Sequence, residues 1–420
     1  MNRLKHVKNC RICDSELTPI LDLREQYLQG SFCHPNRPEP SHRKIPLELM
    51  WCDTTKGKNA CGAVQLSKTI PPYILYNEYW YVSATTQTMR DHLKSIVDMA
   101  TNIIPPITQK HLINVLDIAA NDGTLLSYYP SCYRKYAVDP SSVVCSIKDP
   151  SVTVIKDFFP TEKLKNIKFD IITSIAVLYD LENPETFIDN IRHILSDNGI
   201  WIFEMSYLPT MLQMNAFDTV CGEHIFYYSL SVIESLLETC GMKLIDATLN
   251  DINGGSVQCV AVKKRCNNFC ISHENINKLR NLEFDMALDD ITPYNEFADR
   301  TYSILNNLLR MIHYIKANGK TVHLYGASTK VNTLLQAARI DNNLIPYAAE
   351  RNADKFGAHT LGTNIEIISE EESRKMKPDY YLVGPWHFKT EILEREKDAI
   401  ASGTKFIFPL PNLEIYPPEK

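Results

Sequence analysis

A strand–turn–helix pattern near residue 120 has the residue types of a site that holds a small molecule. The apolar start of VLDIAANDG (115–123) reaches an acid, and a turn of short residues then opens into a helix. Short polar residues and glycine tolerate tight or left-handed backbone, so the main chain at such a turn can approach a bound nucleoside closely. The alternative is an ordinary strand-to-helix turn inside an α/β core. The expected nucleoside contacts are Asp117, Ala119, Asn121 and Gly123.

Further acids follow at spacings that suit the same ligand. Asp139 ends a second apolar run about 20 residues downstream, where a carboxylate can take both hydroxyls of a ribose. Asp157 and Phe158 end a third run, and residues 169–179 supply a fourth strand. This order resembles the class I S-adenosylmethionine (SAM) methyltransferase fold, an α/β fold with a Rossmann-like core. The resemblance implies that SAM is the nucleoside and that Asp139, Asp157 and Phe158 belong to its site.

Cysteines near the amino terminus have the spacing of a metal site. Cys10 and Cys13 form a C-x₂-C knuckle, and Cys52 with Cys61 would complete four thiolates around zinc. A closed four-thiolate site is structural, because it leaves no open position for a substrate. The second pair is wider than a usual knuckle, and a set of reduced thiols without metal is the other interpretation. Three residues between the pairs are alternative ligands, namely Cys33, His34 and His42.

Length and composition describe a globular protein of two or three domains. The 420 residues are 44% hydrophobic and 22% charged, and the formal net charge is −6. A chain without a basic excess is not favoured to bind nucleic acid, and no apolar run approaches membrane-spanning length. We therefore expect a cytoplasmic protein with no nucleic-acid or membrane partner. Its twelve cysteines are expected to be metal ligands or buried thiols, not disulfides.

The pattern of the chain indicates four segments. We predict a zinc-binding module with little periodic structure at 1–66, a tyrosine-rich connector at 67–98, a methyltransferase domain at 99–280 and a second Rossmann-like α/β domain at 281–420. The remaining predicted features are a turn at 197–199 before a strand at 200–207, a late strand at 259–264, a hinge near 265–280, a long helix at about 290–317 and a strand at 321–326.

Several segments taken together resemble the SAM-dependent sugar C-methyltransferases, and the resemblance covers nearly the whole chain. That family acts on nucleotide-linked 4-keto-deoxysugars, often at C3. The resemblance implies SAM and structural zinc as cofactors, a nucleotide-activated sugar as substrate, and a substrate contact at Asn253. The matching segments are Cys10/Cys13 with CGAVQL (61–66), YNEYWYVSATTQTMRDH (76–92), VLDIAANDG (115–123), FDTVCGEHIFYYS (217–229), NGGS (253–256), YGASTKVNTLL (325–335), ERNADKFG (350–357) and PDYYLVGPW (378–386).

Carbon methylation requires a nucleophilic carbon, which a ketone supplies when it loses its α-proton and becomes an enolate. That step needs a general base and hydrogen-bond donors for the enolate oxygen. His224 is the candidate base, and Glu223 beside it can orient a ring or adjust a proton. The resemblance assigns this pair to catalysis. It also makes Tyr79 a candidate catalytic group and Tyr81 a cofactor contact. The alternatives are a solvated Glu-His pair and tyrosines that only pack.

A second strand–turn–helix pattern opens the carboxyl-terminal half of the chain, at residues 325–330. Backbone N–H groups at the start of such a helix, helped by a lysine, can hold a diphosphate. Helix capping by the serine of this turn is the alternative. The expected substrate contacts in this half are Gly326, Ser328, Lys330, Glu350, Arg351 and Trp386.

The chain departs from the family within its active-site segment. Tyr-His-Glu-His is typical there, and this chain has Cys221-Gly222-Glu223-His224. A thiol is a poorer hydrogen-bond donor than a tyrosine hydroxyl, which weakens enolate stabilisation. O- or N-methylation of a related nucleotide sugar therefore stays open. So does a catalytically silent protein that binds SAM or a sugar nucleotide. The sequence is compatible with a monomer or a homodimer.

Overall fold

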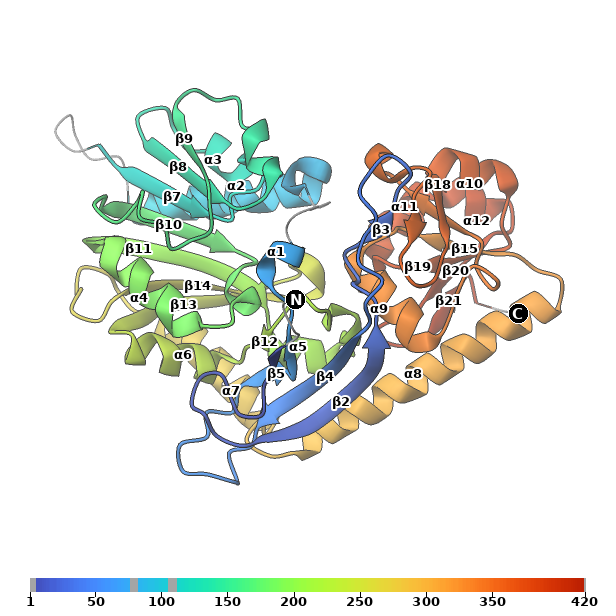
Figure 1. Ribbon diagram of the computed structural model, residues 1–420, viewed down its shortest axis with the longest axis horizontal. Coiled ribbons are helices and arrows are strands. Elements are labelled where there is room, and N and C mark those ends of the chain that lie inside the picture. Colours follow the sequence, from blue (N-terminus) through green and yellow to red (C-terminus); the bar gives the residue numbers. More distant parts are fainter. Residues whose placement is uncertain (1–4, 76–81, 105–111, 419–420) are drawn as a thin grey trace.

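The computed structural model describes residues 5–75, 82–104 and 112–418. Figure 1 shows two α/β bodies side by side, one from the middle of the chain and one from its carboxyl-terminal part. An antiparallel sheet from the amino-terminal segment and the long helix α8 (Thr292–Ala317) run below and between them. This arrangement leaves the facing sides of the two bodies to form a shared site.

The first body is built on a seven-stranded sheet in the order β13-β14-β11-β10-β7-β8-β9. From β9 to β11 the neighbouring strands run parallel, whereas β14 pairs antiparallel with β11 and β13. The turns that follow β7, β8 and β10 therefore lie at one edge of the sheet, which is where α/β proteins bind ligands. The strands are β7 (Asn114–Ile118), β8 (Arg134–Asp139), β9 (Val152–Lys156), β10 (Phe169–Ile175), β11 (Leu195–Ser206), β13 (Met242–Asn250) and β14 (Ser256–Lys263).

Helix α2 (Gln87–Ile103) brings the connector onto this sheet. The side chain of Thr86 accepts a hydrogen bond from the N–H of Met89 and so caps the helix start. The buried residues of α2 recur at helical spacing, from Leu93 to Ala100, and form one apolar face. The other helices of this body are α3 (Thr124–Ser127), α4 (Pro184–Ile194), α5 (Leu208–Gln213), α6 (Leu230–Thr239) and α7 (His273–Asp285).

The amino-terminal segment forms a sheet that extends into both bodies. Its long strands are β2 (Leu17–Gln26) and β4 (Ile45–Cys52), followed by β5 (Val64–Leu66). The short strand β12 (Phe226–Tyr227), from the middle of the chain, completes this sheet in the order β12-β5-β4-β2. The prediction of little periodic structure at 1–66 is thus wrong, because this segment forms long strands and β4 alternates between buried and half-buried residues over most of its length. Smaller elements nearby are β1 (Lys5–His6), β6 (Lys68–Thr69) and α1 (Pro72–Leu75).

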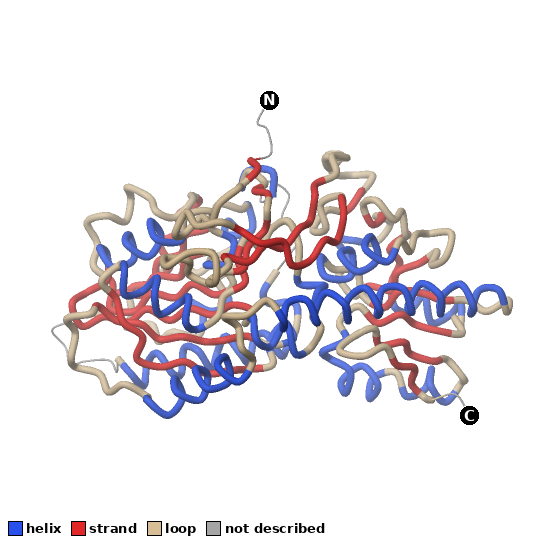
Figure 2. Tube along the Cα trace, turned by 90° about the horizontal axis from the view of Figure 1, so that it is seen from below, coloured by secondary structure: helices blue, strands red, loops and turns tan. Residues whose placement is uncertain are grey.

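The carboxyl-terminal body contains an eight-stranded sheet in the order β21-β20-β19-β15-β16-β18-β17-β3. Its edge strand β3 (Phe32–Cys33) comes from the amino-terminal segment and pairs antiparallel with β17. Figure 2 shows the long α8 running across to this body. The other strands are β15 (Val322–Tyr325), β16 (Tyr347–Glu350), β17 (His359–Thr360), β18 (Glu366–Ser369), β19 (Tyr380–Val383), β20 (Lys405–Phe408) and β21 (Glu414–Tyr416). The helices are α9 (Thr329–Ala338), α10 (Glu370–Met376), α11 (Lys389–Arg395) and α12 (Lys397–Ala401).

The apolar core is continuous across the sequence segments. Trp51 of β4 packs against Tyr294 of α8 with ring centroids 5.2 Å apart, and both belong to the same buried cluster as Phe406 of β20. Because large aromatic side chains contribute most of the buried area, this cluster ties the amino-terminal sheet to the carboxyl-terminal body. Among the described helices, none is long and apolar enough to cross a membrane.

Two local predictions need correction, and one strand was missed. The turn expected at 197–199 is an irregularity inside β11, where the pairing register with β10 shifts, and Asp197 there accepts hydrogen bonds from Lys263 and Arg265. The segment 265–280, expected to be a hinge, leads into helix α7. Glu283 of this helix accepts a hydrogen bond from the hydroxyl of Tyr207 at 2.6 Å, so the helix is anchored to the first body. Strand β13 has no counterpart among the predicted strands. The long helix and the strands at 259–264 and 321–326 correspond to α8, β14 and β15.

Candidate active site

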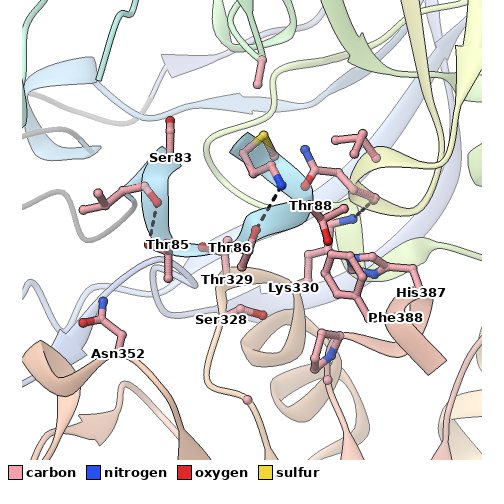
Figure 3. Close-up of a pocket in the computed structure, with 18 of the residues that line it drawn as sticks. Ser83, Thr85, Thr86, Thr88, Ser328, Thr329, Lys330, Asn352, His387 and Phe388 are labelled. Atoms are coloured by element: carbon pink, nitrogen blue, oxygen red, sulfur yellow. Dashed lines mark hydrogen bonds between the residues drawn. The ribbon is translucent and has the colours of Figure 1, made fainter. Parts of the chain in front are cut away.

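A cavity of about 470 Å³ is lined by residues from the connector, the seven-stranded sheet and the carboxyl-terminal body. It lies at the carboxyl ends of the parallel strands, as the topology leads one to expect. Figure 3 shows connector residues Ser83 to Thr88 together with Ser328 and Lys330 at the start of α9. One cavity therefore combines the two regions in which the sequence predicts nucleotide-type sites.

The turn after β7 lines this cavity with Asp117 and Ala119. Ala119, Asn121 and Gly123 have φ values of 58°, 50° and 76°, so the turn has the left-handed backbone that its sequence indicates. At Ala119 that conformation carries strain which glycine would avoid. The carboxyl of Asp117 accepts a hydrogen bond from Oγ1 of Thr173 at 2.6 Å, and burial raises its pKa to about 7.

The polar side chains of the same turn hold the connector and do not line the cavity. The N–H of Ser83 donates to Oδ1 of Asn121 at 3.0 Å, and the N–H of Ala84 donates to Oδ2 of Asp122 at 2.9 Å. Gly123 lies behind the cavity wall, where an added Cβ would come within 2.8 Å of Ile147. The turn thus positions the connector segment that enters the cavity.

Asp139 is buried behind this turn. Its Oδ2 accepts the N–H of Asn121 at 3.0 Å, and its Oδ1 accepts the N–H and the hydroxyl of Ser141 at 2.7 and 2.6 Å. Asp157 and Phe158 follow β9 at the exposed end of the sheet, and Phe158 is 46% exposed. None of these three predicted cofactor contacts lines the cavity.

The cavity wall has the chemical groups that SAM requires. The Asp117 carboxyl suits an ammonium group, and the small side chain of Ala119 leaves the main chain accessible to a ribose. Met89, Leu93 and Leu125 supply an apolar surface for an adenine ring. Residues of the first body thus fit a bound SAM, with Asp117 and Ala119 as the predicted contacts that the structure places at the cavity.

Four thiols of the amino-terminal segment converge. The sulfurs of Cys10 and Cys61 are 3.6 Å apart, those of Cys13 and Cys52 are 3.4 Å apart, and all four lie within 4.8 Å of one another. A tetrahedral zinc with Zn–S bonds of about 2.3 Å needs sulfurs about 3.8 Å apart, so this group fits the ion. The N–H groups of Ile12 and Cys61 donate to two of the sulfurs, which favours thiolates. The alternative ligands Cys33 and His42 lie in a separate group with Glu39.

The candidate catalytic pair lines the cavity between the two bodies. Nδ1 of His224 lies 2.8 Å from the carbonyl oxygen of Thr219, and the His224 ring lies against that of Tyr179 with centroids 4.3 Å apart. Burial lowers the pKa of His224 to about 4. Burial also raises the pKa of Glu223 to about 7. At neutral pH the ring is therefore uncharged, while the carboxyl is poised between its two protonation states.

The two residues before this pair, Cys221 and Gly222, lack the hydroxyl and the imidazole of the Tyr-His sequence that is typical of the resembled family. The N–H of Gly222 donates to Oε1 of Gln29 at 3.1 Å, and an added Cβ at Gly222 would lie 2.4 Å from Cδ1 of Ile70. The space next to Gly222 is thus taken by Ile70. Cys221 lines the cavity, and burial raises the pKa of its thiol.

The carboxyl-terminal body contributes Gly326, Ser328, Glu350 and Arg351 to the cavity wall. The hydroxyl of Ser328 accepts the N–H of Val331 at 3.4 Å, so the capping role that the sequence allowed is present. The Glu350 carboxylate accepts the N–H groups of Ala327 and Arg351, at 2.9 and 2.7 Å. It thereby ties the turn after β15 to the turn after β16.

Lys330 and Asn253 also line the cavity, whereas Trp386 does not. Nζ of Lys330 donates a hydrogen bond to the carbonyl oxygen of Asn253, which joins the two bodies. Nε1 of Trp386 donates to Oδ2 of Asp218 at 2.8 Å, and the indole is 4% exposed. Trp386, predicted as a substrate contact, thus makes a buried contact to the segment before the catalytic pair.

Tyr179 and Glu204 line the cavity but are not among the site residues that the sequence predicts. Tyr179 follows the fourth parallel strand, and its place at the carboxyl end of that strand is a signal that could have identified it. Glu204 accepts hydrogen bonds from Nε2 of His92 at 2.8 and 2.9 Å and thereby holds the connector helix. The candidate residues Tyr79 and Tyr81 lie outside the described residues.

Comparison with known families assigns the segments in order. A methyltransferase zinc binding domain matches residues 10–76, a methyltransferase domain matches 89–247, and a C-methyltransferase C-terminal domain matches 251–411. The chain is a SAM-dependent C-methyltransferase. This C-methyltransferase is 25% identical to the C-methyltransferase NovU of Streptomyces niveus over 419 residues, 97% of this chain and 96% of that protein.

Solved structures resemble part of the C-methyltransferase. A SAM-dependent methyltransferase from Clostridium acetobutylicum has a TM-score of 0.33 and 12% identity, over 43% of this chain and 93% of that chain. The glycopeptide N-methyltransferase MtfA, complexed with SAM, has a TM-score of 0.32 and 13% identity, over 41% of this chain and 93% of that chain.

Proposed function

We propose that this protein transfers the methyl group of SAM to C3 of a nucleotide-linked 4-keto-deoxysugar, through an enolate formed with His224 as the base. The observation that carries the proposal is the 2.8 Å hydrogen bond between Nδ1 of His224 and the carbonyl oxygen of Thr219. A carbonyl oxygen only accepts, so Nδ1 holds the proton and Nε2 is left with a lone pair. Since burial lowers the pKa of His224 to about 4, the ring stays neutral and can accept a proton.

Glu223 is the second acid–base group of the proposed mechanism. A histidine with a pKa of about 4 is a weak base, whereas general bases act best with a pKa close to the working pH. The Glu223 carboxyl has a pKa of about 7 and lines the same cavity. We infer that Glu223 either passes the proton from His224 to solvent or removes it directly, and variants of the two residues distinguish these roles.

The proposed substrate is supported by the position of the carboxyl-terminal body. SAM would occupy the side of the cavity near Asp117 and Ala119, and the sugar nucleotide would lie against the start of α9, with Glu350 and Arg351 towards its ribose or base. A positive helix end suits a diphosphate. The two substrates would then meet at the catalytic pair. NovU, which this chain matches over nearly its whole length, is named a C-methyltransferase.

Incubation with methyl-labelled SAM and a panel of dTDP- and GDP-linked 4-keto-6-deoxyhexoses tests the proposal. Base-stable label on the sugar, with loss of the α-hydrogen, supports carbon methylation. Label in an ether or an amine that retains the α-hydrogen would assign O- or N-methylation. Binding without transfer would assign the silent alternative, which the replacements at Cys221 and Gly222 motivate. His224→Asn should lose at least about 10²-fold in transfer rate and still bind both substrates, as expected for a positioned base.

A further inference from the structure

The amine of Lys330 belongs to the carboxyl-terminal body but contacts the first body at the catalytic cavity. Lys330 is the second residue of α9, and its Nζ donates to the carbonyl oxygen of Asn253. An added Cβ at the neighbouring Gly254 would lie 3.8 Å from Nζ, so the amine rests against the backbone of this turn. Figure 3 shows Lys330 beside His387 and Phe388, both of which line the cavity.

The surroundings of Lys330 give its positive charge a role at the catalytic pair. The charge on Lys330 lowers the pKa of His224 and that of His387, and it opposes the rise in the pKa of the buried Asp218. Oδ1 of Asp218 has no hydrogen-bond partner among the described residues. His387 itself is neutral, since burial lowers its pKa to about 3. Burial lowers the pKa of Lys330, and the neighbouring Asp218 and Cys221 oppose that shift by favouring the charged amine. In its charged form Lys330 supplies positive charge to the cavity that the catalytic histidine lines.

Two other cationic residues that line the cavity, Lys355 and Arg395, make hydrogen bonds within the carboxyl-terminal body. Nζ of Lys355 donates to the carbonyl oxygen of Ala327 at 2.7 Å. The guanidinium of Arg395 donates to the hydroxyl of Tyr325 at 3.1 Å. Of these three cations, only Lys330 makes its hydrogen bond to the first body.

We propose that the Lys330 ammonium stabilises the enolate oxygen of the keto-sugar, so that the carboxyl-terminal body supplies a catalytic residue as well as a binding surface. The inference rests on the proposed function, because it requires an enolate. It also gives the enolate oxygen a partner in a chain that has Cys221 and Gly222 at the positions where the resembled family typically has tyrosine and histidine. A preorganised positive charge placed where the oxygen becomes negative is a general way to stabilise such an oxyanion.

The reaction balances with these groups. The base takes the α-proton, the C–H electron pair forms the C=C bond, and the carbonyl π electrons move to the oxygen that faces the Lys330 ammonium. The enolate carbon then attacks the SAM methyl group, the S–CH₃ bond breaks and S-adenosylhomocysteine leaves. The C=O bond forms again, and the proton on the base passes to solvent. Lys330 keeps all its protons throughout.

The competing role for Lys330 is the diphosphate contact that the sequence suggests. The two roles differ in what they change. A diphosphate contact acts on binding in the ground state, whereas an oxyanion contact acts on the rate once the sugar is bound. Exchange of the sugar's α-hydrogen in D₂O without SAM isolates enolate formation, and it is followed by mass spectrometry at saturating sugar nucleotide.

The variants are Lys330→Met, Lys330→Arg and, as a control with the same change at an exposed lysine, Lys375→Met. The probes are the dTDP- and GDP-linked 4-keto-6-deoxyhexoses. We expect Lys330→Met to lower the saturated exchange rate by about 10²–10³-fold, with sugar-nucleotide affinity changed by no more than about threefold. Lys330→Arg should retain part of the rate, and Lys375→Met all of it. Unchanged SAM affinity in Lys330→Met shows that the variant is folded.

An exchange rate at saturation that survives Lys330→Met, together with a loss of affinity, would overturn the inference and assign Lys330 to the diphosphate. If Lys330→Met does not fold, Lys330→Ala assayed with added alkylamines replaces it. Rescue of exchange by the amine supports the inference, and absence of rescue in a folded variant contradicts it. Absence of exchange in the wild-type protein with every probe would refute the proposed function, and with it the enolate on which Lys330 would act.

Discussion

Gly30 lies directly against the carboxylate of Glu223. An added Cβ at position 30 would come within 2.2 Å of Oε1 of Glu223 and 3.3 Å of Oγ1 of Thr329. The amino-terminal segment, the catalytic segment and the start of α9 therefore meet at one point of the cavity wall. Only a residue without a side chain leaves room for Glu223 in this position.

Gly30→Ala should consequently impair catalysis more than folding. The new methyl group has to displace the Glu223 carboxylate, so we expect methyl transfer to fall at least about tenfold while SAM affinity is kept. Calorimetry with SAM and an assay with labelled SAM measure the two effects. Gly57→Ala is the matched control, because an added Cβ there meets nothing within 4 Å. Full activity of Gly30→Ala would show that the position of Glu223 does not matter.

Glu223 should give the protein a pH dependence near neutrality. Its folded pKa of about 7 lies above the ordinary value of 4.5, so the proton is held more tightly in the folded state. If the ionised carboxylate is needed, kcat/KM rises with pH up to about 7 and then levels off. Glu223→Gln should lose this rise. His224 gives no such limb above pH 5, since its pKa of about 4 keeps it neutral there.

The same raised pKa predicts the effect of Glu223 on stability. The stabilising contribution of protonated Glu223 is complete below the unfolded pKa and is lost as pH rises through about 7. Above that pH the wild-type protein buries an ionised carboxylate, and Glu223→Gln should be the more stable protein. Thermal unfolding midpoints of both proteins between pH 5 and 9 measure the difference. Parallel curves over this range would show that burial does not shift the Glu223 pKa.

Asp139→Ala should weaken SAM binding and also loosen the turn that leads to it. The carboxylate accepts hydrogen bonds from Asn121 and Ser141, and such bonds to a charged group contribute about 1.5–3 kcal/mol. We expect the free energy of unfolding to fall by about this amount and SAM affinity to fall with it, because the turn that carries Ala119 loses its support. Asp157→Ala, at a half-buried site outside the cavity, is the comparison. SAM affinity in calorimetry that is equal for both variants and the wild-type protein would contradict a role for Asp139.

The protein should contain about one zinc ion per chain, held by the four-thiol group. Replacing Cys10 and Cys13 together by serine should remove the metal and much of the stability, because binding energy at such a site is folding energy. Metal analysis of protein purified without added zinc measures the content. Cys132→Ser and Cys33→Ser, outside the group, should leave it unchanged. A metal-free sample with the unfolding midpoint of the zinc-loaded protein would rule out a structural role.

The sequence predicts the parts of this molecule that depend on local pattern. The left-handed turn at Ala119 to Gly123 follows from short residues after a strand, and the zinc ligands follow from one knuckle and a second cysteine pair. The capping serine of α9 is also local. Each of these features depends on a few neighbouring residues, so propensity and spacing are sufficient to find it.

The contacts that complete the site could not be predicted in this way. Gly30 and Glu223 are far apart in the sequence, and only the packed fold brings them together. Strands β3 and β12 are two residues long and pair with segments distant in the chain, so no periodic signal marks them. The bulge in β11 carries turn residues, Asp197 and Asn198, which pattern reasoning assigns to a loop. Tertiary pairing overrides local preference at each of these places.

The pairing of β3 with β17 has a consequence for how the protein is made. Phe32 lies opposite Thr360, so one of the first strands to leave the ribosome has no partner until most of the chain has followed. At synthesis rates of about 5–20 residues per second, that wait lasts roughly half a minute. During this time the apolar strand has to remain free of other chains. A carboxyl-terminal fragment expressed alone would have the opposite defect, an open edge at β17 that invites association. Newly made chains should therefore depend on chaperones until the last domain has emerged.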